Sequence, residues 1–103
     1  MHIRFEQTGG IMGRKISLDL NTSDLPANEA GILRQALDET NFFALPANMV
    51  TQLVPDEMQY VITVETENVI HSVRTSDTTA TPGLRALIQN LSQKARSHRT
   101  KKE

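Results

Sequence analysis

The sequence predicts an α+β fold, with four strands in one antiparallel sheet and two helices packed on one face of it. Two observations support this prediction. Two pairs of segments alternate apolar and polar residues with period 2, and each pair is joined by a stretch of turn-forming residues. One segment after each pair places apolar residues at the 3.6-residue spacing of an amphipathic helix. The expected element order is therefore ββαββα.

The composition is that of one small soluble domain, which we expect over residues 1–96. The chain has 103 residues, of which 38% are hydrophobic and 22% charged, enough for one modest core. It has no cysteine, so disulfides, thiolate metal sites and cysteine nucleophiles are excluded. No apolar run approaches the length of a signal or membrane-spanning segment. We therefore expect a cytoplasmic protein without a membrane partner, although secretion by another route stays open.

The first pair of strands forms a hairpin over residues 1–20. Its two arms alternate apolar with polar or charged residues, so each arm has one buried and one solvated face. The residues of the buried face are Ile3, Phe5, Ile16, Leu18 and Leu20.

The tip of this hairpin, residues 8–13, is the least ordinary part of the chain. Three of the five glycines lie there, and glycine reaches positive φ without steric cost, so the chain can reverse. Ile11 and Met12 are bulky and apolar where a tight turn normally carries polar residues. Either these side chains fold back onto the domain or they are held out for a partner, and composition does not decide between the two.

A cluster of turn-forming residues at 21–24 precedes the first expected helix, which begins near Pro26. Asn41 is a candidate for a left-handed residue at the end of this helix. The stretch 42–46 is too apolar for a free loop, so we interpret it as a plug at the edge of the core. The helical stripe that we expect to face the sheet consists of Ala30, Leu33, Ala36 and Leu37.

Residues 47–58 show neither period and are expected to form a long connection, a kind of segment that is often functional. Alternation returns in 59–65 and in 69–75, which form the second hairpin. The uncovered face of the sheet is expected to be solvated and to carry Arg4, Glu6, Lys15, Asp19, Thr63 and Glu65.

The last helix is expected to begin with Thr81 as N-cap and Pro82 as its first residue. Its apolar stripe comprises Leu84, Leu87, Ile88, Leu91 and Ala95.

Charge is unevenly distributed along the chain. The net charge is −1, but residues 1–90 carry −5 and residues 91–103 carry +4. The basic end suggests a nucleic-acid-binding arm as one alternative. Because no basic stripe or stacking aromatics continue from it and the body is acidic, we instead expect a disordered, solvated tail over 97–103 and no nucleic-acid partner.

The sequence offers no constellation that would support catalysis or a bound metal. His2, His71 and His98 do not stand at the spacings that place two ligands on one helix face. His71 is expected to be a partly buried, hydrogen-bonded residue at the edge of the core. The carboxylate pairs 38–39 and 56–57 are neighbours in sequence, which usually diverge in space. We therefore expect neither an enzyme nor a cofactor.

Five features in this order resemble the emfourin family, small bacterial inhibitors of protealysin and other thermolysin-like zinc metallopeptidases. The resemblance covers nearly the whole chain, to about Arg96. It implies a proteinaceous inhibitor that is encoded beside its target and shares its cytoplasm; we expect it to be monomeric when free. The zinc would belong to the protease. The features are the opening MHIRFEQTGG, Phe42-Phe43 followed by Leu45-Pro46, the strand 60–64, His71-x-Val73, and the helix 82–88.

The protease-binding site that we infer is the hairpin tip, because thermolysin-like enzymes prefer a bulky apolar residue just after the scissile bond. Ile11 or Met12 would occupy that pocket, while the glycine backbone pairs with the strand edge of the cleft. The alternative is a non-catalytic interaction module, an adaptor or subunit without a protease target. The contact residues we predict are Thr8, Gly9, Gly10, Ile11, Met12, Gly13 and Arg14, with Met49, Asp56, Asp77 and Thr78 as secondary contacts.

Overall fold

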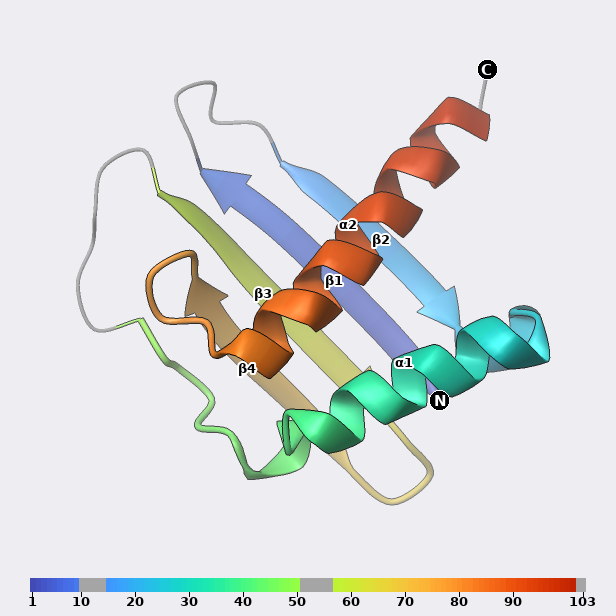
Figure 1. Cartoon of the computed structure of the whole chain (residues 1–103), viewed down its shortest axis with the longest axis horizontal. Helices are drawn as coiled ribbons and strands as arrows, with labels where there is room; N and C mark the ends of the chain where they lie inside the picture. The colour runs from blue at the N-terminus through green and yellow to red at the C-terminus, as the bar shows by residue number, and fades with distance from the viewer. Residues whose placement is uncertain (10–14, 51–56, 102–103) are drawn as a thin grey trace.

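The structure, a computed structural model, describes residues 1–9, 15–50 and 57–101, with side chains as far as Ala95. It confirms the α+β fold and the order ββαββα, with both helices on one side of a single sheet (Figure 1). Neither helix is long and apolar enough to cross a membrane, within the residues described. The elements are β1 (His2–Gly9), β2 (Ile16–Asn21), η1 (Thr22–Asp24), α1 (Ala27–Glu39), η2 (Phe42–Ala44), β3 (Met58–Glu65), β4 (Ile70–Ser76) and α2 (Pro82–Lys101).

The sheet has the strand order β2-β1-β3-β4, and every neighbouring pair is antiparallel. Each predicted hairpin contributes two strands, and the two hairpins join where β1 pairs with β3. Ile3 lies opposite Val64 and Phe5 opposite Ile62 at this central junction, and all four side chains are fully buried. The first strand of the chain is therefore an interior strand, while β2 and β4 form the two edges.

The core lies between the sheet and the helices, and α2 crosses it diagonally (Figure 1). The uncovered face is solvated as predicted, because Arg4, Lys15, Asp19 and Glu65 are exposed, with Glu6 and Thr63 half-buried. The helices bury the apolar positions that their spacing predicts, among them Leu33, Leu37, Leu84, Leu87 and Leu91.

The element boundaries differ in detail from the sequence pattern. Pro26 is the N-cap of α1, and Asn41 has the predicted left-handed conformation, with φ 51°. The Thr81 hydroxyl accepts the N–H of Leu84 at 3.3 Å, which confirms the cap of α2. The predicted plug enters the core only in part: Phe42 is 1% exposed and Leu45 packs against the core, but Phe43 is 44% exposed.

Part of the long connection joins the sheet. Asn48 forms a parallel bridge with Arg74 of β4, through N–H···O bonds of 2.8 Å from Arg74 to Ala47 and from Met49 to Arg74. The predicted domain boundary at residue 96 falls within α2, where the structure describes no side chains, and it stays a prediction.

Candidate functional site

The predicted contact residues that the structure describes lie mostly at one end of the sheet. β1 ends there at Gly9, β3 begins at Met58, and β4 leads into Asp77 and Thr78 (Figure 1). Residues 10–14 and Asp56 lie outside the described residues. The site is therefore built here from the residues that flank them.

Gly9 occupies a position that only glycine fits. Its φ is +107°, and a Cβ there would lie 2.5 Å from the carbonyl oxygen of Glu57. In register, Gly9 pairs with Met58, so the end of β1 lies directly against the start of β3. Because a side chain would both strain the backbone and clash, the main-chain conformation at the end of β1 requires glycine.

Asp77, just beyond β4, ties the start of β3 in place. Its carboxylate accepts the Tyr60 hydroxyl at 2.7 Å through Oδ1 and the Met58 N–H at 3.2 Å through Oδ2. The main chain adds a third link, because the Asp77 N–H donates to the Met58 carbonyl at 3.2 Å. One short side chain therefore fixes two positions of the neighbouring strand.

Glu57 makes the reciprocal contact. Its carboxylate accepts the N–H of Thr78 at 2.9 Å, so each of the two segments caps a main-chain group of the other. Arg85 of α2 donates to the carbonyl of Asp77 at 3.1 Å and connects the helix layer to the same loop. The end of β1, the start of β3, the loop after β4 and the first turns of α2 thus form one connected frame.

The environment of Tyr60 shows how closely this frame is packed. Its ring is 9% exposed and stacks on Phe5, with ring centroids 6.1 Å apart. Burial raises the pKa of Tyr60 above its ordinary value of 10.0, and the hydrogen bond and negative charge of Asp77 raise it further. The phenol therefore stays a neutral donor, which keeps the Asp77 contact intact.

The structure brings Thr8, Gly9, Asp77 and Thr78 to this end of the sheet, whereas Met49 lies along the outer edge of β4. Met49 is half-buried and packs against the core.

Sequence reasoning missed three members of the frame: Glu57, Tyr60 and Arg85. Tyr60 was visible as the single tyrosine, but its partner depends on where β4 ends. Tertiary pairing, rather than local pattern, selects these contacts.

Among the residues that the structure describes, no group of three His, Cys, Asp or Glu side chains could hold a metal ion. His71 is half-buried, and its Nε2 donates to the Leu45 carbonyl at 2.8 Å, as expected of a residue at the edge of the core. The frame offers paired main chain and hydrogen-bonded carboxylates beside the point where the first hairpin loop leaves β1.

Comparison with known proteins shows which family the chain matches. A family model described as Emfourin matches residues 5–92. That match begins within β1 and ends about halfway along α2. No curated protein and no solved structure matches the chain.

Proposed function

The chain belongs to the emfourin family, a family of metallopeptidase inhibitors, and we propose that it inhibits thermolysin-like zinc metallopeptidases of the protealysin type. The first hairpin loop would block the cleft that holds the protease's catalytic zinc. The chain would itself act without a cofactor and without catalysing a reaction.

The frame at the loop end of the sheet is the observation that supports this proposal. Gly9 is fixed against the Glu57 carbonyl, and Glu57 and Asp77 lock the start of β3 to the loop after β4. An inhibitor must hold its contact segment in shape, because ordering that segment on binding would cost affinity. Here the segment departs from a strand end that is fixed before any partner arrives.

The proposed mechanism assigns separate roles to side chains and main chain. Ile11 or Met12 enters the apolar pocket that receives the residue after the scissile bond, and desolvation of that side chain supplies much of the affinity. The main chain of the glycines pairs with the strand edge of the cleft. The zinc stays a component of the protease.

The test is an inhibition assay with a thermolysin-like peptidase and the variants Ile11→Ala, Met12→Ala and the double variant. Truncating an anchor typically costs about 2 kcal/mol or more, so the inhibition constant should rise at least about thirtyfold for one of them. Ile70→Ala is the matched control, because Ile70 is 66% exposed and begins β4 at the opposite end of the sheet.

Two results would contradict the proposal at different levels. Inhibition that survives the double variant with a loss below about 1 kcal/mol would remove the anchor assignment while leaving the function intact. Absence of inhibition by the unmodified chain against any thermolysin-like enzyme, protealysin included, would favour the adaptor or subunit alternative.

A further inference from the structure

No described strand pairs with the outer edge of β2. The Thr22 N–H donates to the Met1 carbonyl at 2.9 Å. Every second residue before it on β2, namely Leu20, Leu18 and Ile16, therefore also directs its main-chain groups toward β1. Because main-chain groups alternate direction along a strand, those of Ser17, Asp19 and Asn21 point away from β1. In the described part of the chain these groups have no main-chain partner.

The opposite edge of the sheet, formed by β4, is partly paired with another segment of the chain. The Arg74 N–H and carbonyl on β4 also point outward, and they pair with Ala47 and Met49 of the same chain. The chain thus covers part of one edge with its own extended segment, whereas no segment that the structure describes pairs with the other edge.

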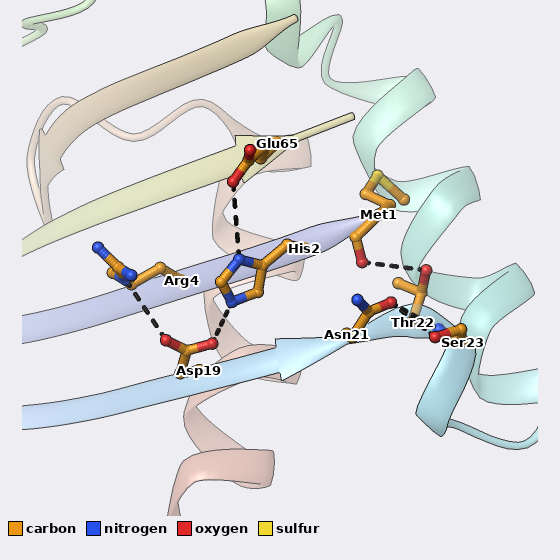
Figure 2. Close-up of polar contacts among 8 residues, drawn as sticks. All are labelled: Met1, His2, Arg4, Asp19, Asn21, Thr22, Ser23 and Glu65. Atoms are coloured by element: carbon orange, nitrogen blue, oxygen red, sulfur yellow. Dashed lines mark hydrogen bonds and ion pairs between the residues drawn. The ribbon is translucent and has the colours of Figure 1, made fainter. Parts of the chain in front are cut away.

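The side chains that could shield the β2 edge are drawn away from it (Figure 2). The Asp19 carboxylate faces β1, where it binds His2 and lies 3.5 Å from Nε of Arg4. Its pKa is lowered, chiefly by the hydrogen bond from His2, so it stays ionised in this contact. Asn21 turns the other way and caps η1, accepting the Ser23 N–H at 3.0 Å. Edge strands normally use polar and charged side chains to prevent pairing with another strand. Here the side chains of Asp19 and Asn21 are engaged in contacts within the chain instead.

A groove of about 800 Å³ adjoins the same edge on the helix side. It lies between the end of β2, the start of α1 and the middle of α2, and its apolar lining includes Leu20, Leu25 and Ile32. Ile32 is 53% exposed, so it adds an apolar side chain to the accessible surface of the groove. A strand added to β2 would direct alternate side chains into this groove.

The polar lining of the groove is complementary to a cation. Asn90 Oδ1 is buried without a hydrogen-bond partner among the described residues. Asp24 and Glu29 add carboxylates, and the one cation in the described lining, Lys94, is already held by Glu29 at 2.6 Å. A buried acceptor without a donor is costly, so a ligand that supplies an N–H would be stabilised there.

We propose that the β2 edge and this groove bind an extended segment of a partner protein that carries an arginine or lysine. The segment pairs with the main chain of Ser17, Asp19 and Asn21. The aliphatic stem of its basic side chain rests on Leu25 and Ile32, and its charged head donates to Asn90. This inference goes beyond the inhibitory function and does not depend on it.

The probe is a synthetic pentapeptide, acetyl-Thr-Val-Arg-Val-Thr-amide, titrated into the full chain labelled with nitrogen-15. Amide signals of Ser17, Asp19 and Asn21 and the side-chain amide of Asn90 should shift together. The peptides with Glu or Leu in place of Arg should bind at least about tenfold more weakly, since they lack the charged donor.

Two variants test the two halves of the site. Ser17→Pro removes an outward N–H and leaves the hydrogen bonds between β2 and β1 intact. An edge strand tolerates proline at such an outward position. The variant should abolish binding of all three peptides. Asn90→Leu removes the acceptor and should reduce the preference for Arg over Leu about tenfold while main-chain pairing persists. Circular dichroism establishes that each variant is folded.

Three outcomes would overturn the proposal. The first is the absence of any shift at the β2 edge with the peptide in large excess. The second is a set of shifts confined to β4 or the loop end of the sheet. The third is movement of the β2 signals with protein concentration alone, which would make a second copy of the chain the occupant of this edge.

Discussion

At the scale of single residues, Tyr60 allows the loop-end frame to be tested directly. It is the only tyrosine, and the chain has no tryptophan, so ultraviolet absorbance of tyrosinate reports on this residue alone. The raised pKa means that the folded state favours the protonated phenol. The associated stability is complete below pH 10.0, the ordinary pKa, and is lost as pH rises from there toward the folded-state value. We expect the absorbance titration to begin well above pH 10 and to coincide with unfolding.

Tyr60→Phe gives the control for this titration. It removes the hydrogen bond to Asp77 but keeps the ring that stacks on Phe5. We expect the variant to be less stable at neutral pH by about 1 kcal/mol in urea denaturation, and to lose less stability than the unmodified chain on alkaline titration. A tyrosine that titrates at its ordinary pKa in the native chain would contradict the buried Asp77 contact.

Gly9 and Gly31 form a second matched pair at this scale. Gly9→Ala forces a side chain into φ +107° and toward the Glu57 carbonyl, so we expect a loss of about 2 kcal/mol or more in the free energy of unfolding. Gly31 lies within α1 with open space around its Cα, and Gly31→Ala should stabilise the chain by about 0.5–1 kcal/mol. Urea denaturation of both variants measures the contrast. Equal effects would show that Gly9 is not confined as described.

At the scale of elements, the two phenylalanines of η2 should behave differently although they are adjacent. Phe42 is 1% exposed and meets His71 edge to face, with ring centroids 5.6 Å apart. Phe42→Ala should therefore cost about 3–5 kcal/mol, whereas Phe43→Ala, at a side chain 44% exposed, should cost about 1 kcal/mol or less. Thermal unfolding of the two variants gives the comparison. A larger loss for Phe43 would reverse the assignment of which ring fills the core.

The elements that local pattern determines were predictable from the sequence. Alternation places Ile3 and Phe5 on one strand face, and Pro26 and Pro82 fall within one residue of the two helix starts. The sheet order was not predictable, because pairing of β1 with β3 joins segments far apart in the chain and depends on shared burial against the helices. The same applies to the frame: Asp77 was a predicted contact residue, but its hold on Tyr60 and Met58 requires that pairing.

At the scale of the whole molecule, the fold separates a rigid interior from two unequal edges. β1 and β3 are paired on both sides, and their inner faces carry fully buried residues such as Ile3 and Ile62. The frame at the loop end is attached to this interior pair through Gly9 and Met58. The strand end from which the first hairpin loop departs therefore belongs to the two strands that are paired on both sides. β2, by contrast, has a strand neighbour on one side only within the part of the chain that the structure describes.

This arrangement predicts the pattern of amide hydrogen exchange across the sheet. Amides between β1 and β3 can exchange only when the core opens, so their protection should approach that of global unfolding. The outward N–H groups of Ser17, Asp19 and Asn21 should exchange rapidly although they belong to a strand. On β4, Arg74 donates to Ala47 and should be slower than Ser72, whose N–H points outward in the same direction without a main-chain partner among the described residues. Exchange followed by NMR resolves each of these amides separately. The N–H groups of Leu18 and Leu20 point toward β1. If the N–H groups of Ser17, Asp19 and Asn21 were equally protected from exchange, the β2 edge would be covered in solution and unable to receive a partner strand.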